Sequence, residues 1–247
     1  MKKLVVFGDS CAKGIVTDSG RPLPAKPCAV DILGEKLLFD EVENISAFGQ
    51  TIVKLSERKL VERYIETIKP GDKVYSVIWI GGNDVDYDWR QVALSPDYPH
   101  SSKTGLCAYS EILHDLTAKL KKVSEKVFLV TLLPVNSQRY FDSVISKIAD
   151  GNAVLKFLDG DVTNISRKQE MFNIEVVKTA YEMEVGLIDL RTKLLMLNDC
   201  FDYYCADGIH LSQTGQRLAA TIISEIIDNE ERSLLRSVKN EKFSAFV

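Results

Sequence analysis

The chain has 247 residues, a length that suits one large α/β domain or two small ones. Its net charge of −4 at pH 7 and its sequence pI near 5.5 argue against a nucleic-acid-binding surface. No apolar run reaches transmembrane length, and the one after Met1 stops at Gly8, too early for a signal peptide. The five cysteines form no C-x-x-C pair, so we expect reduced thiols in a cytoplasmic protein.

Buried-strand runs alternate with amphipathic helical stretches, the pattern of a mostly parallel α/β sheet. The first half of the chain predicts a strand at Leu4–Gly8, a helix at Cys28–Leu38, a strand at Glu41–Ser46, a helix at Ile52–Lys69 and a strand at Lys73–Ile80. The second half predicts a helix at Tyr109–Ser124, a strand at Val127–Leu133, a helix at Lys168–Glu184, a strand at Leu187–Leu190 and a helix at Ser212–Asp228. We expect one domain over residues 1–247 around a five-stranded sheet; the role of residues 230–247 stays open.

Two stretches, at about 85–106 and 134–167, break this alternation and are expected to be loop insertions. Loops of this length inside a compact domain are usually functional or partly helical. Each begins at a strand end, so both are expected to wall the same site. Their candidate substrate-binding rings are Tyr87, Trp89 and Tyr140, each of which has a plain packing role as its alternative. Residues 145–158 are apolar enough to be a lid helix or a homodimer contact.

Ser10 directly follows the first predicted strand, at the edge where open α/β sheets bind ligands. A serine that leads into a helix also benefits from the helix dipole, which favours a developing alkoxide. Taken alone, this position is more typical of an ordinary helix N-cap. Ser10 is therefore a candidate nucleophile that needs a base.

Three histidines are available as that base. His114 falls within a predicted helix and His100 within the first irregular stretch. His210 follows Asp207 by three residues in a turn marked by Gly208, a spacing that lets the carboxylate fix the imidazole tautomer. A turn aspartate and a packed histidine remain the alternative for this pair.

Asn83 comes just after the third predicted strand, behind the glycine pair at 81 and 82. Those glycines let the backbone turn tightly, and the asparagine amide can then reach an oxyanion. Gly49, after the second strand, can bring a backbone N–H to the same point. A Gly-Gly-Asn-Asp turn needs no function, and for Gly49 alone an ordinary turn is the stronger interpretation.

Together these segments resemble the SGNH, or GDSL-type, hydrolase superfamily of serine esterases and acylhydrolases. Its four blocks match Ser10 in Gly8-Asp9-Ser10, Gly49, Asn83 in Gly81-Gly82-Asn83-Asp84, and His210 in Asp207-Gly208-Ile209-His210. The resemblance implies a flavodoxin-like three-layer α/β/α sandwich with Ser10, Asp207 and His210 as catalytic triad. It also implies an oxyanion hole formed by Ser10 N–H, Gly49 N–H and the Asn83 side chain. Cys11 departs from the Leu or Ile that is usual after the serine, and a packing role is expected for its thiol.

The predicted activity is hydrolysis of a small-molecule ester with a short acyl group, such as an O-acetyl group on a carbohydrate. A lysophospholipase or thioesterase is the alternative enzyme, and a non-catalytic carbohydrate or small-molecule binder is the alternative of another class. No cofactor is expected. The alternating aspartates that begin at Asp84 start like a calcium loop, but its sixth-position glycine and twelfth-position glutamate are missing, so no metal site is predicted.

Overall fold

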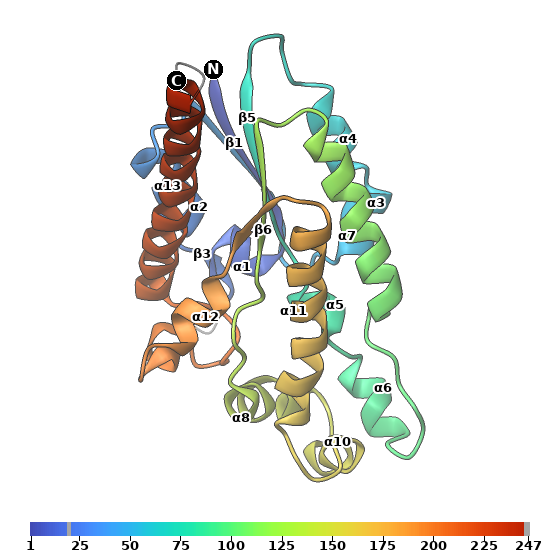
Figure 1. Cartoon of the computed structure of the whole chain (residues 1–247). Coiled ribbons are helices and arrows are strands. Elements are labelled where there is room, and N and C mark those ends of the chain that lie inside the picture. Colours follow the sequence, from blue (N-terminus) through green and yellow to red (C-terminus); the bar gives the residue numbers. More distant parts are fainter. Residues whose placement is uncertain (19–20, 245–247) are drawn as a thin grey trace.

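The computed structural model describes residues 1–18 and 21–244, with side chains described as far as residue 231. Five parallel strands form the central sheet in the order β4-β1-β5-β6-β7 (Figure 1). Their bounds are Lys2–Gly8 for β1, Glu41–Ser46 for β4, Lys73–Trp79 for β5, Lys126–Val130 for β6 and Gly186–Ile188 for β7. All five lie where the sequence predicts a strand, and their order is the flavodoxin-like one.

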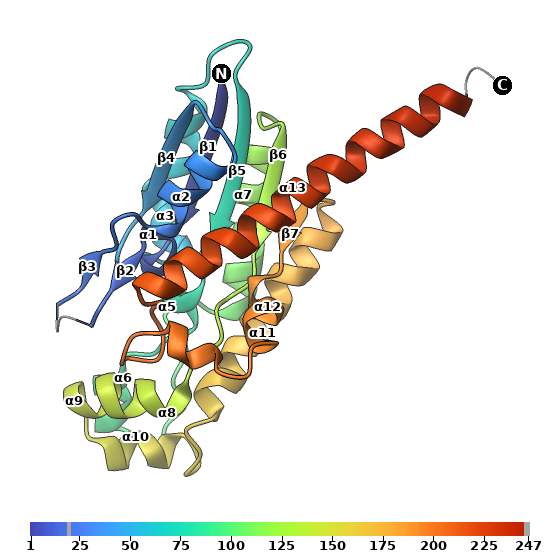
Figure 2. The ribbon, with the colours of Figure 1, turned by 90° about the vertical axis from the view of Figure 1, so that its left-hand side faces the viewer.

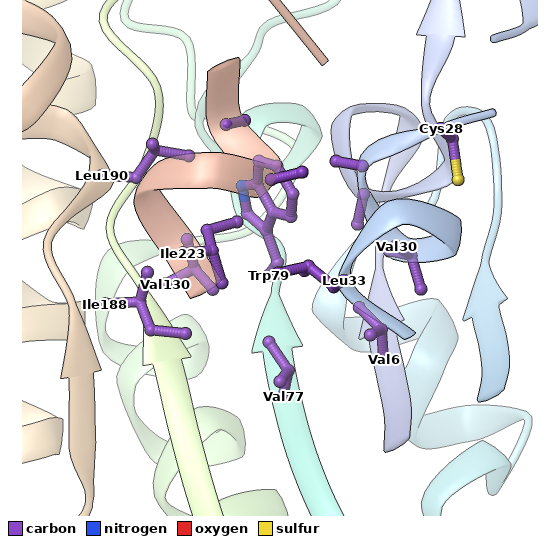
Figure 3. Close-up of a cluster of buried hydrophobic side chains, with 14 of the residues drawn as sticks. Val6, Cys28, Val30, Leu33, Val77, Trp79, Val130, Ile188, Leu190 and Ile223 are labelled. Carbon is purple, nitrogen blue, oxygen red and sulfur yellow. The ribbon is translucent and has the colours of Figure 1, made fainter. Parts of the chain in front are cut away.

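Both faces of the sheet are covered, which confirms the three-layer sandwich. Alternate residues of β1 point to opposite faces, so Leu4 and Val6 join one core while Val5 and Phe7 join the other. The first face carries α2 (Ala29–Lys36), α12 (Leu190–Leu195) and α13 (Gln213–Ser244). Figure 3 shows Trp79 of β5 at the centre of that core. The second face carries α3 (Ile52–Glu57), α4 (Leu60–Ile65), α7 (Leu106–Lys121) and α11 (Asn164–Glu182).

Two predicted helices differ from the observed ones. The single helix expected over Ile52–Lys69 is two helices, because Lys59 adopts the left-handed conformation with φ of 51° and interrupts the hydrogen-bond ladder. The break re-aims α4, so that Val61 and Tyr64 reach the same core as Ile52. The last helix continues from the expected end at Asp228 to Ser244 and projects beyond the sheet in Figure 2.

The two stretches expected to be loops contain short helices. Residues 85–106 hold α6 (Trp89–Leu94), and residues 134–167 hold α8 (Ser137–Tyr140), the π-helix Phe141–Ile145, α9 (Ser146–Ile148) and α10 (Gly151–Phe157). These two stretches, called the cap below, lie beyond the carboxyl ends of the strands (Figure 1). They enclose their own core of Trp89, Val92, Tyr140, Ile145, Val154 and Leu158. This burial accounts for most of the apolar residues that made 145–158 a candidate lid or dimer contact.

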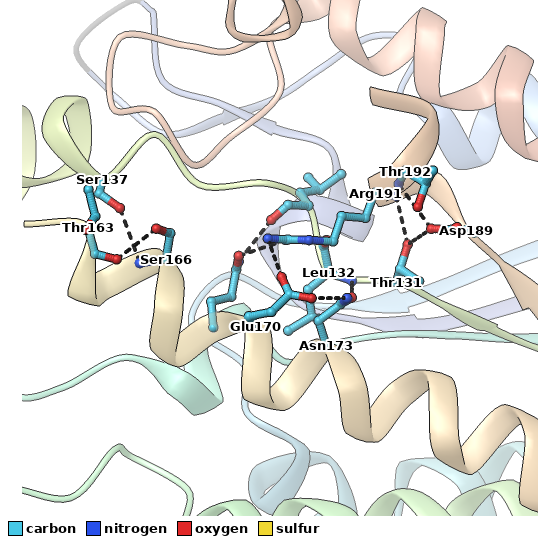
Figure 4. Close-up of polar contacts among 12 residues, drawn as sticks. Thr131, Leu132, Ser137, Thr163, Ser166, Glu170, Asn173, Asp189, Arg191 and Thr192 are labelled. Carbon is cyan, nitrogen blue, oxygen red and sulfur yellow. Dashed lines mark hydrogen bonds and ion pairs between the residues drawn. The ribbon is translucent and has the colours of Figure 1, made fainter. Parts of the chain in front are cut away.

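Helix α11 belongs both to the cap and to the sheet. Near its start, the side chain of Gln169 donates to Leu133 O at 2.9 Å and accepts from Arg191 Nη1 at 3.1 Å. One turn later, Asn173 Oδ1 accepts a 3.0 Å hydrogen bond from Leu132 N (Figure 4). These buried contacts fix α11 to the chain that leaves β6. The cap is therefore held at a set position above the strand ends.

Candidate active site

Ser10 is the first residue of α1 (Ser10–Lys13), a single turn that begins directly after β1. The turn is tight: a Cβ on Gly8 would lie 2.6 Å from Trp79 O and would also collide with Ala12. Asp9 caps the turn, because its Oδ1 accepts a 2.9 Å hydrogen bond from Cys11 N. The local sequence therefore leaves the Ser10 side chain at the carboxyl edge of the sheet, where it borders a cavity.

The structure brings Ser10, His210 and Asp207 into one hydrogen-bonded chain, although 200 residues separate Ser10 from His210. With its proton on Nδ1, the imidazole donates to Asp207 Oδ2 at 2.7 Å, and Nε2 accepts from Ser10 Oγ at 2.9 Å. The other carboxylate oxygen accepts from the backbone N–H groups of Ile209 and His210, both at 3.0 Å. All three side chains are nearly buried but line the cavity.

Asp207 is held in its ionised form. Burial by itself raises the pKa of this carboxyl, but the hydrogen bond and charge of His210, together with Thr17, outweigh that effect and lower it to about 2. Thr17 contributes a hydroxyl that donates to Asp207 Oδ2 at 2.6 Å. An ionised carboxylate fixes the imidazole orientation and stabilises the imidazolium that would form when Nε2 takes a proton.

The other two histidines lie away from this chain. His114 contacts Glu182 Oε2 at 2.9 Å, between α7 and α11, and His100 contacts Ser95 O at 2.9 Å inside the cap. Neither lines the cavity beside Ser10. His210 is therefore the histidine that the fold places beside the candidate nucleophile, as its spacing from Asp207 predicts.

Three N–H donors border the cavity beside Ser10. The backbone N–H groups of Ser10 and Gly49 donate no hydrogen bond within the described residues. Gly49 has a φ of 69°, a left-handed conformation that favours glycine. The Asn83 amide gives one N–H to Gln50 O at 3.2 Å and keeps its second N–H available. Three N–H groups arranged in this way suit an oxyanion.

Two buried carboxylates join the three loops that carry these donors. Asp9 accepts from Cys11 N and, through Oδ2, from Gly82 N at 3.2 Å, which links the Ser10 turn to the Asn83 turn. Asp84 accepts from Ile52 N at 2.9 Å and from Thr104 Oγ1 at 2.6 Å, which links the Asn83 turn to the segment after Gly49. Burial raises the pKa of Asp84 to about 7, against its hydrogen bonds from Thr104 and Ile52.

Cys11 borders the cavity next to Ser10, but its thiol is held protonated. Burial, followed by the charges of Asp9 and Asp207, raises the pKa of Cys11 well above its ordinary value. A thiol is a weak nucleophile unless it is ionised. The geometry therefore favours Ser10 over Cys11 as the attacking group.

The cavity has a volume of about 490 Å³ and runs from Ser10 into the cap. Its walls are mainly apolar side chains: Val85, Leu132, Leu133, Val135, Val144, Leu158 and Ile165. The three predicted substrate-binding rings also line it. Trp89 and Tyr140 are almost fully buried, and both donate to Asp86 Oδ1, from Nε1 at 2.8 Å and from the hydroxyl at 3.0 Å. Tyr87 is the most accessible of the three.

Sequence reasoning missed several residues of this site. Thr17 lies beside the small hairpin formed by β2 (Ile15–Val16) and β3 (Leu23–Pro24), which has no periodic pattern. Asp84 stands next to Asn83, and its strand-end position is the signal that could have pointed to it. Lys168 and Lys103 also line the cavity, but no sequence motif marks either of them.

Neither a metal cluster nor a membrane span occurs in the described part of the chain. No group of three or more His, Cys, Asp or Glu side chains there is arranged to hold a metal ion. No helix within it combines the length and apolar character that crossing a membrane requires.

Several solved structures share this fold. A lipase/acylhydrolase from Enterococcus faecalis has a TM-score of 0.63 at 20% identity and covers 93% of this chain and 97% of its own. An acetylxylan esterase from Geobacillus stearothermophilus has a TM-score of 0.60 at 21% identity, covering 91% of this chain and 93% of its own. A member of the lipolytic G-D-S-L family from Veillonella parvula has a TM-score of 0.58 at 15% identity, covering 91% and 97%.

A comparison with curated protein sequences finds no match. The model of the GDSL-like lipase/acylhydrolase family, in contrast, matches residues 6–218, which contain all four sequence blocks. The resemblance seen in those blocks is thereby confirmed, and the chain belongs to the GDSL-like lipase/acylhydrolase family.

Proposed function

We propose that this protein is a cofactor-independent serine ester hydrolase. The observation that carries the proposal is the unbroken hydrogen-bonded chain from Asp207 through His210 to Ser10 Oγ, at 2.7 and 2.9 Å, which opens into an apolar cavity. A non-catalytic binder has no need of this chain. The family match supports an ester hydrolase as well.

The proposed reaction has two halves. Ser10 Oγ attacks the ester carbonyl carbon while His210 Nε2 takes its proton, and the ionised Asp207 stabilises the resulting imidazolium. The carbonyl oxygen becomes an oxyanion that accepts from Ser10 N–H, Gly49 N–H and the free N–H of Asn83. His210 returns the proton to the alcohol oxygen as the C–O bond breaks. Water then attacks the acyl-serine by the same route and releases the acid.

The cavity has room for an acyl or alcohol group larger than acetyl. Cavities of roughly 300–1,000 Å³ hold drug-sized ligands, and this one, at about 490 Å³, has mainly apolar walls. Burying apolar ligand surface there contributes about 25 cal/mol per Å². The cavity therefore favours an acylhydrolase that acts on an ester, lysophospholipid or thioester with an apolar chain. An O-acetyl carbohydrate is the second candidate, because Tyr87, the least buried of the three rings, forms part of the wall.

A panel of p-nitrophenyl esters from acetate to dodecanoate, with acetylated xylose and an acyl thioester, tests the proposal. We expect kcat/KM to rise beyond acetate and then to fall when the chain outgrows the cavity. The highest kcat/KM on acetate and acetylated xylose would favour the second candidate. Lack of turnover on the entire panel, together with no labelling of Ser10 by a phosphonofluoridate, would contradict the hydrolase itself.

The cytoplasmic location and the homodimer contact stay predictions. Gel filtration with light scattering, on the wild type and on Ile148→Glu, tests the second. Ile148 is 44% exposed on the cap, so a dimer built on this segment should dissociate in the variant.

A further inference from the structure

The charged side chains that line the cavity are matched with partners, with one exception. Asp207 is paired with His210, and the Asp9 carboxylate accepts from backbone N–H groups. Lys103 Nζ forms a 2.7 Å ion pair with Asp86 Oδ2. The remaining cation of the lining is Lys168, which forms no ion pair with any described residue.

Two aromatic rings hold the Lys168 ammonium at the cavity wall. Its Nζ lies 4.7 Å from the ring centroid of Tyr87 and 4.8 Å from that of Phe157. The rings themselves pack edge to face, 5.5 Å apart, so they form a fixed seat. Ile165, Lys168 and Gln169 line the cavity from successive turns of α11, and Gln169 fixes this part of the helix to Leu133 O.

This seat positions a positive charge without neutralising it. The face of an aromatic ring attracts a cation through its quadrupole, but it carries no net charge. Lys168 is half-buried beside apolar walls, and the two rings take the place of water on their side of its ammonium, so an anion there interacts more strongly than it would in bulk water. Lysine offers three donors around a compact charge, which suits a carboxylate or a phosphate.

We propose that Lys168 forms a subsite for an anionic group, a carboxylate or phosphate carried by the substrate away from its ester bond. This inference rests on the proposed hydrolase function, because it names the class of ester that the same cavity selects. Lys103 does not share the role. Its partner Asp86 also accepts from Trp89 and Tyr140, so this ion pair belongs to the framework of the cap.

The kinetic test compares matched esters that differ in one charge. On the acyl side the pair is mono-p-nitrophenyl adipate and p-nitrophenyl hexanoate; on the alcohol side it is 4-acetoxybenzoate and its methyl ester. The variants are Lys168→Met and, as a control for net charge, Lys147→Met, an exposed cap lysine outside the cavity lining. We expect Lys168→Met to lower kcat/KM about tenfold, mainly through KM, on the anionic member of at least one pair.

Lys168→Met should lower the anionic-to-neutral ratio of kcat/KM for at least one pair, and Lys147→Met should leave both ratios unchanged. Which pair responds tells whether the anion belongs to the acid or to the alcohol. Equal loss on charged and neutral esters, or no change on either, would overturn the subsite. An equal shift of the anionic-to-neutral ratio in Lys147→Met would attribute the effect to long-range charge and would also overturn the subsite.

Binding to the Ser10→Ala variant separates the subsite from the chemistry. Calorimetric titration with adipate monoamide and with the neutral diamide should show tighter binding of the anion, lost when Lys168→Met is added. If neither ester series is turned over while this preference is present, the hydrolase proposal fails and the subsite stands. If esters are turned over and neither kinetics nor titration shows a charge preference that depends on Lys168, the subsite fails alone.

Discussion

The Thr17 hydroxyl and the His210 imidazole both donate to the same oxygen of Asp207, at 2.6 and 2.7 Å. Thr17 is itself fixed, because its backbone N–H lies 3.4 Å from Cys205 Sγ. Since Asp207 Oδ1 is occupied by two backbone N–H groups, the carboxylate has donors on both oxygens. Its plane is thereby set, and with it the plane of the imidazole that faces Ser10.

Thr17→Val should therefore reduce kcat without removing any member of the Ser10–His210–Asp207 chain. A hydrogen bond to a charged group contributes about 1.5–3 kcal/mol, so we expect a loss of roughly tenfold or more. Thr17→Ser keeps the hydroxyl and should restore kcat. An equal loss in Thr17→Ser, or a change in KM alone, would mean that Thr17 acts through packing of the hairpin.

Ser10→Ala should abolish ester hydrolysis and leave the fold intact, because the hydroxyl borders the cavity and not the core. Loss of a nucleophile whose triad acts as a unit costs about 10⁴-fold or more in kcat. Cys11→Ala is the matched control and should keep activity within several-fold of the wild type, since its thiol stays protonated. Activity that survives in Ser10→Ala and disappears in Cys11→Ala would assign the chemistry to the cysteine.

Asn83→Ala should lower kcat by about 10²–10³-fold with little change in KM, because an oxyanion donor acts mainly in the transition state. Steady-state kinetics on a single ester measures both constants. The control is Asn152→Ala, which removes an exposed asparagine side chain of the cap outside the cavity lining and should leave both constants unchanged. A rise in KM at constant kcat would show that Asn83 holds the ground-state substrate instead.

Asp84 should make the protein less stable as pH rises. An aspartate of the unfolded chain ionises near pH 3.9, whereas burial raises the pKa of Asp84 in the fold to about 7. Between these values the unfolded state binds fewer protons, so the stability that this group contributes falls as pH increases. Asp84→Asn should remove this pH dependence. Its free energy of unfolding should therefore rise relative to that of the wild type by up to about 4 kcal/mol between about pH 4 and about pH 8.

Urea unfolding at a series of pH values measures this difference. Asp97→Asn, at an exposed position on the cap, serves as the control and should run parallel to the wild type. A constant difference between Asp84→Asn and the wild type across the pH range would contradict a raised pKa at Asp84.

The sequence was sufficient for the sheet and for the residues at its edge. The strands before Ser10 and Asn83 are buried on both faces and read as apolar runs, whereas the strand before Gly49 is a half-buried edge strand in which polar and apolar residues alternate. Because parallel strands end at one edge, these residues had to meet. His210 could be assigned by elimination, since its turn holds the carboxylate three residues away.

Other parts of the structure could not be predicted, because the residues that form them carry no local sequence pattern. The cap helices α8, α9 and α10 have three to seven residues, too few for a helical period to stand out, so they were expected as loops. The left-handed conformation of Lys59 has no signal in its residue type, because lysine rarely adopts it. Thr17 meets Asp207 across 190 residues, and only the folded chain shows that meeting.

The cap has its own apolar core, separate from the two cores that flank the sheet. Its residues 137–158 contain neither Ser10, Asn83 nor His210, yet they supply Tyr140, Val144 and Leu158 to the cavity. Under the proposed function, sequence change there can therefore alter which esters fit while Ser10, Asn83 and His210 keep their positions. Because this segment shares its core with Trp89 and Val92, such change is confined to side chains that still fill that core.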